Sequence, residues 1–247
     1  MSAMYRRVCP ELLDELDPDD PRAQRSRRDL KRVHRAMGSL TILRQSVSQL
    51  RLAAPPMSIM ELGAGDGTLL LRLAGAMRPQ WKGVALTLLD RHRVVGLKTL
   101  EAYRRISWNV NVVCEDALRW ATQPVTMTKR YDLCIASLFL HHFEEPDLRM
   151  LLAGVAARTE AFIASEPRRD QFAKLGSHLV GLLGTNAVTR EDAKKSVAAG
   201  FAEDEISSAW PKEGGTWWTR EFSALPFSHC FLAVRHRARA AYAQHGC

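Results

Sequence analysis

The 247-residue chain lacks any run of about 18 apolar residues, so no membrane-spanning helix is predicted. It also lacks the apolar segment of a signal peptide, because MSAMYRRVCPELLDELDPDD turns acidic where that segment would lie. Internal repeats and low-complexity tracts are absent too. With 46% hydrophobic residues, the sequence predicts a soluble, cytoplasmic protein with one sizeable core, alone or with an appended cap.

Cysteines are few and widely spaced. They are Cys9, Cys114, Cys134, Cys230 and Cys247. No CxxC pair occurs among them, and Cys114 and Cys134 lie in apolar runs that are typical of buried strands. We therefore expect reduced thiols, and no metal site is predicted.

Positive charge is concentrated near the N-terminus. The chain carries a net charge of +8, but residues 1–20 hold two Arg and six acidic residues. Residues 21–51 hold nine Lys or Arg and a single acidic residue. This basic segment could attract nucleic acid, an anionic lipid or an acidic substrate, or it could simply be a solvated helix face.

Apolar strands and helices alternate after Pro55 and Pro56. The predicted strands are Ser58–Leu62, Val84–Asp90, Asn111–Cys114, Tyr131–Leu140, Ala161–Ser165, Phe201–Trp210 and Ser228–Val234. The helices between the first five strands are predicted at Thr68–Ala76, Val94–Arg105, Ala117–Thr122 and Pro146–Thr159. Short strands rich in β-branched residues are typical of a parallel sheet covered on both faces. The predicted fold class is a doubly wound α/β sheet.

Two helical regions are predicted outside this alternation. Residues 1–54 contain a helix start at Pro21 and apolar residues at steps of three and four, interrupted near Gly38. We expect them to form a lid over the carboxyl edge of the sheet. Residues 55–247 would form the core, with a helical insertion at about 168–200. The helices of that insertion are predicted at Phe172–Leu183 and Thr189–Ala199.

The segment MELGAGDGTL follows the first strand and contains three alternating glycines, which indicate that the backbone approaches a ligand closely. A dinucleotide fingerprint needs GxGxxG, but Thr68 stands where its third glycine would be. A phosphate loop needs a Gly-Lys-Ser/Thr ending, which is also missing. Glu61 would repel an anion and suits a cationic ligand.

Together with later acidic residues, this loop resembles the class I S-adenosylmethionine-dependent methyltransferases. The family's first motif, acid-x-Gly-x-Gly-x-Gly, matches ELGAGDG at every position. The other matches are Asp90 at the end of ALTLLD, Asp116 in VVCEDA, and the pair Tyr131-Asp132 at the start of the fourth strand. The resemblance covers about residues 57–145.

The resemblance implies S-adenosylmethionine as the cofactor and a seven-stranded, Rossmann-like sheet whose last strand, CFLAVR, runs antiparallel beside the sixth. Asp90 would accept hydrogen bonds from the ribose hydroxyls, and Asp116 would meet the adenine amino group. The implied cofactor-binding residues are Glu61, Gly63, Gly65, Gly67, Asp90, Arg91, Asp116, Ala117 and Ser137.

Candidate bases for methyl transfer follow the fourth strand, in ASLFLHHF. An oxygen nucleophile must lose a proton, and histidine titrates near neutral pH. His141 and His142 are therefore the predicted catalytic residues, with a structural role as the alternative. Because adjacent side chains point differently, we expect only one of them to act. Glu166 is a second candidate, but we expect it to pair with Arg168 or Arg169.

The methyl acceptor is predicted to be a small aromatic or polyketide-like molecule, methylated at oxygen. The Asn/Asp-Pro-Pro-aromatic motif of adenine and glutamine methyltransferases is missing, since SLFL stands in its place. RSRRDLKRVHRAMGS and TREDAKKSVAAGF weakly resemble bacterial enzymes that act on polyketide-derived phenols and quinones. The residues predicted to form an apolar cap over the crevice are Met37, Phe172, Leu175, Leu179, Leu182, Leu183, Trp210, Trp217 and Trp218.

Two alternatives remain open. The basic segment 21–51, together with Arg235, Arg237 and Arg239, could form a nucleic-acid face of an RNA methyltransferase, although no RNA-binding module is recognisable. The chain could instead bind the cofactor without catalysis, as the partner of another protein. The sequence does not predict the oligomeric state.

Overall fold

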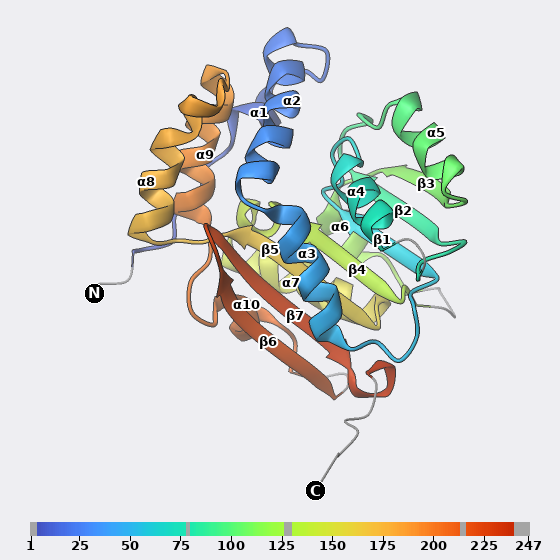
Figure 1. Ribbon diagram of the computed structural model, residues 1–247. Helices are drawn as coiled ribbons and strands as arrows, with labels where there is room; N and C mark the ends of the chain where they lie inside the picture. Colours follow the sequence, from blue (N-terminus) through green and yellow to red (C-terminus); the bar gives the residue numbers. More distant parts are fainter. Residues whose placement is uncertain (1–3, 78–79, 126–129, 213–215, 240–247) are drawn as a thin grey trace, which may run out of the picture.

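The computed structural model describes residues 4–77, 80–125, 130–212 and 216–239 (Figure 1). The strands are β1 (Ser58–Leu62), β2 (Ala85–Asp90), β3 (Asn109–Cys114), β4 (Leu133–Ser137), β5 (Ala161–Pro167), β6 (Trp217–Ala224) and β7 (Ser228–Arg235). The helices are α1 (Leu12–Glu15), α2 (Pro21–Ala36), α3 (Ser39–Leu50), α4 (Thr68–Ala76), α5 (Leu97–Arg105), α6 (Ala117–Thr122), α7 (Glu145–Arg158), α8 (Gln171–Leu179), α9 (Ala187–Ala199) and α10 (Glu205–Ala209). Short 3₁₀ turns lie at Leu140–His142, Val180–Leu183 and His236–Ala238.

A single seven-stranded sheet has the order β3-β2-β1-β4-β5-β7-β6. Strands β1 to β5 pair in parallel, whereas β7 runs antiparallel to both of its neighbours, β5 and β6. The order reverses between β1 and β4, and ligands bind at such a switch point, outside the carboxyl ends of the strands. The predicted doubly wound α/β sheet and its antiparallel last strand are confirmed.

Alternate residues of each strand enter two separate cores, because successive side chains of a strand point to opposite faces. On one face, Met60 and Cys134 pack with apolar residues of α6, α7 and α10. On the other face, Ile59 and Ile135 pack with apolar residues of α3, α4 and α5. Helix α3 thus covers the sheet, although the sequence grouped it with the lid; the domain boundary at residue 54 stays a prediction.

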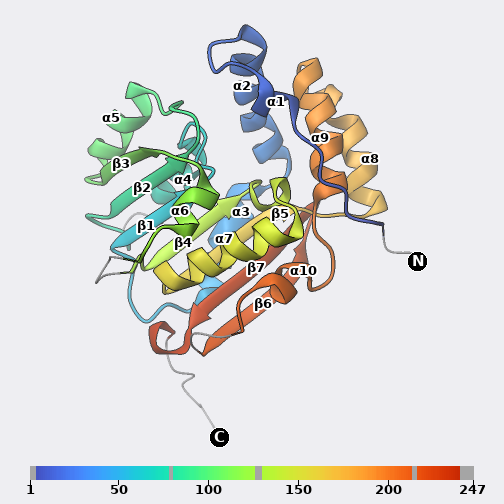
Figure 2. The ribbon, with the colours of Figure 1, turned by 180° about the vertical axis from the view of Figure 1, so that it is seen from behind.

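The remaining helices α1, α2, α8 and α9 gather beyond one end of the sheet (Figures 1 and 2). Asp20 caps α2 by accepting a hydrogen bond from the Arg22 N–H, and Gly38 separates α2 from α3 with a φ of 67°. The carboxylate of Asp192 in α9 accepts the N–H groups of Leu12 and Leu13 and so caps α1. The N-terminal segment is therefore docked on the insertion.

The predicted sixth strand at Phe201–Trp210 is wrong. This stretch contains α10, because Ile206, Ala209 and Trp210 bury one helical face. The sixth strand is β6 instead, at Trp217–Ala224, where the sequence analysis predicted no strand. The predicted strand Tyr131–Leu140 is also too long, since β4 ends at Ser137.

Cys9, Cys114, Cys134 and Cys230 are free thiols, and Cys247 lies outside the described residues. Cys114 is exposed, contrary to the prediction, because β3 is an edge strand. Within the described ranges, no helix has both the length and the apolar character needed to cross a membrane.

Candidate functional site

The loop after β1 is shaped by glycines with left-handed backbone conformations. Gly63, Gly65 and Gly67 have φ values of 63°, 53° and 69°. A Cβ on Gly63 would lie 2.2 Å from the Phe139 ring, so this glycine is needed for packing. A Cβ on Gly65 would meet no atom within 4 Å, which leaves the middle of the loop open to a ligand.

Glu61 lies at the start of this loop and is 4% exposed. Its Oε2 atom is buried and has no hydrogen-bond partner among the described residues. Burial, and then the nearby charges of Asp66 and Asp90, raise the pKa of Glu61 well above its usual value. A buried carboxylate beside two further acids attracts a cation, because a positive charge would relieve both desolvation and repulsion.

Asp90 ends β2 and ties the loop to the neighbouring strand. Its Oδ2 accepts a hydrogen bond of 2.8 Å from the Gly65 N–H, and its Oδ1 accepts one of 2.8 Å from the His92 N–H. Each carboxylate oxygen retains a lone pair for a further donor. On β4, which pairs with β1 on the side away from β2, the buried Oγ of Ser137 has no partner in the described parts of the chain.

The other predicted cofactor residues are spread along the same edge. Asp116 caps α6 through its Oδ1, which accepts the Leu118 and Arg119 N–H groups, and Ala117 is buried behind it. Arg91 instead contacts the lid, since its Nη2 lies 2.9 Å from Asp14 Oδ1. Neither contact tests a role in cofactor binding, so these roles stay predictions.

Asp132, which the resemblance singles out, lies at the opposite end of the strands. Its Oδ2 accepts hydrogen bonds of 2.8 and 2.9 Å from the Met57 and Ser58 N–H groups. This pairing joins the starts of β4 and β1. The aromatic–Asp pair therefore supports the sheet at a distance from the carboxyl edge.

Glu166 organises the turn after β4. Its carboxylate is fully buried and accepts the backbone N–H groups of Phe139, Leu140 and His141. It also lies 2.8 Å from His141 Nδ1. The expected pairing of Glu166 with Arg168 or Arg169 is wrong. Those arginines pair with other acids, at Asp170 and Glu205.

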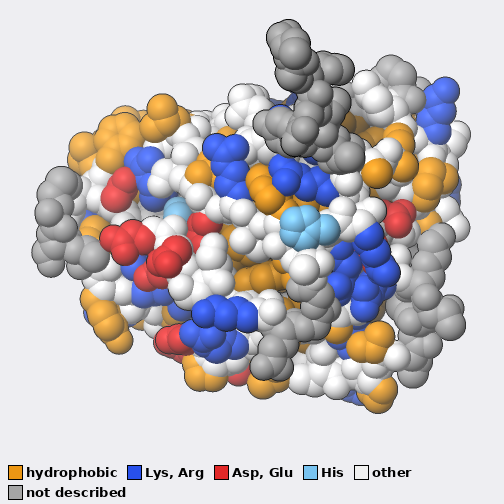
Figure 3. All heavy atoms as spheres, turned by 90° about the horizontal axis from the view of Figure 1, so that it is seen from below, with side chains coloured by type: hydrophobic (Ala, Val, Ile, Leu, Met, Phe, Trp, Pro, Cys, Tyr) orange, Lys and Arg blue, Asp and Glu red, His pale blue; other side chains and the backbone are white. Residues whose placement is uncertain are grey.

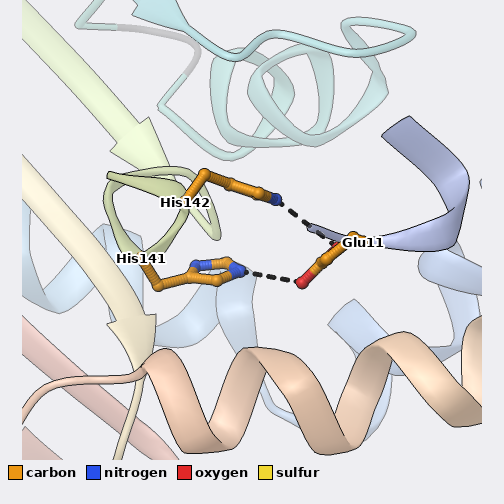
Figure 4. A group of neighbouring side chains, drawn as sticks. All are labelled: Glu11, His141 and His142. Atoms are coloured by element: carbon orange, nitrogen blue, oxygen red, sulfur yellow. Dashed lines mark hydrogen bonds and ion pairs between the residues drawn. The ribbon is translucent and has the colours of Figure 1, made fainter. Parts of the chain in front are cut away.

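His141 and His142 converge on a carboxylate that the sequence analysis did not consider (Figure 4). Glu11 Oε1 lies 3.2 Å from His141 Nε2, and Glu11 Oε2 lies 3.4 Å from His142 Nε2. The ring centroids of the two histidines are 4.2 Å apart. The expectation that the adjacent side chains would separate is wrong, because the 3₁₀ turn brings both to one side.

Electrostatics distinguish the two histidines as candidate bases. Burial by itself would lower the pKa of His141, but the hydrogen bonds and charges of Glu11 and Glu166 outweigh it and raise this pKa to about 9. His141 is then protonated at neutral pH and holds no free lone pair, which argues against the predicted base role. His142 is partly exposed, and its base role stays a prediction.

The lid is fastened to this edge by ion pairs from α1 and α2. Lys31 Nζ lies 2.8 Å from Asp66 Oδ2 in the glycine loop. Glu11 also accepts a hydrogen bond from the Ser196 hydroxyl of α9. Sequence reasoning missed Glu11 because 130 residues separate it from His141 and no local pattern links them.

The predicted apolar cap is only partly assembled. Trp210 stacks on Phe162 in the core and meets Trp217 edge-on, while Trp218 lies under the Arg239 guanidinium. These tryptophans belong to the sheet's own packing, so their assignment to the cap is wrong. The apolar side chains of the insertion are instead exposed: Phe172, Leu175, Leu179, Leu182 and Leu183.

Many basic residues of the alternative nucleic-acid face already have partners within the chain. Arg235 is buried and donates to the Ala156 carbonyl, and Arg237 pairs with Glu160. In the basic segment, Arg22 and Arg32 pair with nearby aspartates. On the face opposite the lid, Lys and Arg side chains form several separate groups (Figure 3). Helix α2 of the basic segment lies on the other side of the molecule (Figure 1), so the nucleic-acid alternative stays a prediction.

Solved structures share this fold, although no protein-family model matches the sequence and no curated protein matches it either. The plantazolicin methyltransferase BpumL in complex with SAH superposes with a TM-score of 0.59 at 15% identity, over 88% of this chain and 91% of that one. Magnesium protoporphyrin IX methyltransferase (ChlM) from Synechocystis PCC 6803 with bound SAH gives 0.51 at 17% identity, over 84% and 86%. An O-methyltransferase family protein from Burkholderia thailandensis gives 0.54 at 14% identity, over 91% and 63%. The chain has the seven-stranded, Rossmann-like fold of these methyltransferases.

Proposed function

We propose that this protein is an S-adenosylmethionine-dependent methyltransferase that acts on a small-molecule acceptor. The observation that carries the proposal is the buried, unpartnered Glu61 Oε2 beside a glycine loop whose middle is open. A cofactor with a cationic amino group satisfies this carboxylate, whereas a phosphate would be repelled by it. The structural neighbours, which contain bound SAH, support the same assignment.

The residues along the carboxyl edge fit such a cofactor. Glu61 would bind the positive amino group, and Gly65 would let the backbone approach it. Asp90 would accept both ribose hydroxyls with its remaining lone pairs. Ser137 would gain the partner that its buried hydroxyl lacks, and Asp116 would accept from the adenine amino group through its Oδ2. When bound, the cofactor supplies an electrophilic methyl group.

The acceptor is proposed to be aromatic or polyketide-like and to be methylated at oxygen. The chain must hold the acceptor oxygen in line with the methyl group and keep water away from it. The lid formed by α1 and α2 suits this task, because it contacts the loops after β1, β2 and β4. The three neighbours, a plantazolicin methyltransferase, a magnesium protoporphyrin IX methyltransferase and an O-methyltransferase family protein, are compatible with a small acceptor.

The cofactor assignment is tested by calorimetric titration of the purified chain with S-adenosylmethionine and S-adenosylhomocysteine, with NAD as a control ligand. We expect micromolar binding of both sulfur compounds and none of NAD. Asp90→Ala should weaken binding by about 100-fold, because two hydroxyls lose a charged acceptor. Glu101→Ala, an exposed acid on α5, is the matched control and should leave affinity unchanged. Equal affinity in both variants would contradict the role of Asp90.

Turnover is tested separately, by transfer of a labelled methyl group to a panel of phenols, quinols and RNA. Label in a phenol or quinol supports the proposal. Label in RNA, with affinity that falls steeply as salt rises, would instead favour the nucleic-acid alternative. Cofactor binding without any transfer would favour a non-catalytic partner protein.

A further inference from the structure

Three metal-ligating side chains meet where the lid closes on the turn after β4 (Figure 4). Glu11, His141 and His142 each offer one ligand atom, and these atoms lie within 4.8 Å of one another. A second carboxylate is close by, since Asp14 Oδ2 lies 3.6 Å from His142 Nε2. Two imidazoles and one or two carboxylates form a common donor set for transition metals.

The far nitrogen of each imidazole is oriented as in metal-binding histidines. His141 Nδ1 lies 2.8 Å from the buried Glu166 carboxylate, and His142 Nδ1 lies 2.9 Å from the Phe139 carbonyl oxygen. Histidines that bind metals almost always donate their other N–H to a carboxylate or a backbone carbonyl, which fixes the ring and the tautomer. Both Nε2 atoms are thereby left to face Glu11, and a bound metal would displace the proton that His141 Nε2 otherwise shares with Glu11.

The distances between the imidazole nitrogens and the carboxylate oxygens are close to those between the ligands of a metal ion. Ligands about 2.0–2.2 Å from a tetrahedral Zn²⁺ lie roughly 3.3–3.6 Å from one another. Glu11 Oε1 lies 3.2 Å from His141 Nε2, the other oxygen, Oε2, lies 3.4 Å from His142 Nε2, and Asp14 Oδ2 lies 3.6 Å from His142 Nε2. One ligand atom from each of Glu11, His141 and His142 lies within 4.8 Å of the others. A charge-assisted hydrogen bond is shorter, about 2.7–2.9 Å, and only the contact between His141 and Glu166 reaches 2.8 Å.

Glu11 is held in place by its surroundings, not only by the histidines. Asp192 caps α1 immediately after it, and Ser196 donates a hydrogen bond to its Oε1. Ligands from the lid and from the β4 turn are therefore brought together by the docking of α1 on α9. A metal bound here would join the lid to the edge of the sheet that carries the glycine loop.

We propose that Glu11, His141 and His142 bind a divalent transition-metal ion of the zinc type, with Asp14 or a water molecule as the fourth ligand. Imidazole donors favour Zn²⁺, Co²⁺ or Fe²⁺ over Mg²⁺ and Ca²⁺, which prefer oxygen ligands. The proposed metal site shares no ligand with the proposed cofactor pocket, but a metal bound to His142 would take the nitrogen that the predicted base role of this residue requires.

The test uses the full chain, stripped with a chelator and titrated with Zn²⁺, Co²⁺ and Mg²⁺ by calorimetry. We expect one equivalent of Zn²⁺ to bind, Mg²⁺ not to bind, and Co²⁺ to show the visible d–d bands of a four-coordinate site. Glu11→Gln and His142→Ala should each weaken Zn²⁺ binding at least tenfold. The matched controls, Glu15→Gln on α1 and the exposed His178→Ala on α8, should not change it.

Other outcomes would overturn the site. The same Zn²⁺ affinity in wild type and in both cluster variants would mean adventitious binding elsewhere. Thiolate-to-Co²⁺ charge-transfer bands would assign the ion to a cysteine such as Cys9, which lies two residues before Glu11. Circular dichroism and S-adenosylhomocysteine titration of each variant show whether it is folded, so that failure of the metal site is distinguished from failure of the cofactor site.

Discussion

The loop after β1 and the turn after β4 are neighbours at the carboxyl edge of the sheet, but they are built differently. The loop obtains its shape from residues 61–67, and the Ala64 and Gly65 N–H groups tie it to the end of neighbouring β2 by hydrogen bonds to the Leu89 carbonyl and the Asp90 carboxylate. The turn depends on Glu11, Glu166 and the docking of α1 on α9, which are remote in sequence. A local motif is thus recognisable in the sequence, whereas a site assembled by long-range contacts is not.

The largest effect on stability is expected for Glu166, which supports the turn after β4. Glu166→Gln places an amide where a buried carboxylate accepts three backbone N–H groups and faces His141, so the free energy of unfolding should fall by about 4 kcal/mol. Urea unfolding followed by circular dichroism measures it. Glu145→Gln, an exposed partner of Arg149 on α7, should cost less than about 1 kcal/mol. Similar losses in the two variants would refute the supporting role of Glu166.

A smaller effect on stability is expected at Gly63, where the loop after β1 packs against Phe139 of the turn after β4. Gly63→Ala adds a Cβ that would lie 2.2 Å from the Phe139 ring, at a φ of 63°, and should cost about 3 kcal/mol of unfolding free energy. Gly75→Ala in α4 has open space around its Cβ and should be neutral or slightly stabilising. If Gly63→Ala is as stable as wild type, the packing between the loop and the turn is not as described.

Glu61→Gln, in the loop after β1, should have opposite effects on ligand affinity and on the free energy of unfolding. S-adenosylhomocysteine affinity should fall by about tenfold, because a neutral amide oxygen can accept a hydrogen bond from the amino group but cannot form an ion pair with it. The unliganded variant should nevertheless be more stable than wild type at pH 7. The pKa of Glu61 is raised in the fold, so its contribution to stability is complete below its usual pKa of 4.5 and is lost as pH rises through the raised value.

The pH dependence provides the check on this prediction. Urea unfolding at several pH values should show the difference between Glu61→Gln and wild type vanishing near pH 4.5 and growing as pH rises. A variant that is less stable than wild type at pH 7 would mean that Glu61 has a partner that compensates its burial.

The smallest effect is expected for the ion pair that joins the lid to the loop. Lys31 and Asp66 are 43% and 28% exposed, so Lys31→Ala should cost less than about 1 kcal/mol, and less still at high salt. Lys194→Ala, in the exposed pair with Glu191 on α9, is the matched control. A larger loss for Lys31→Ala alone, in urea unfolding at low salt, would show that the lid is held chiefly by this contact.

The sequence by itself determined the alternating strands, the glycine loop, and the placement of Glu61 and Asp90 at strand ends. These features depend on short-range spacing: apolar residues mark a strand, a turn follows it, and parallel strands end at one edge. The split between α2 and α3 at Gly38 was predictable for the same local reason.

Only the tertiary structure decided the sixth strand and the surroundings of the histidines. β6 carries exposed and half-buried side chains at the sheet's edge, so its pairing with β7 defines it more than its hydrophobicity does. Glu166 does not pair with its arginine neighbours because its carboxylate accepts three backbone N–H groups of the turn after β4. Glu11 reached His141 and His142 only through the docking of α1 on α9, a contact between segments that no local pattern encodes.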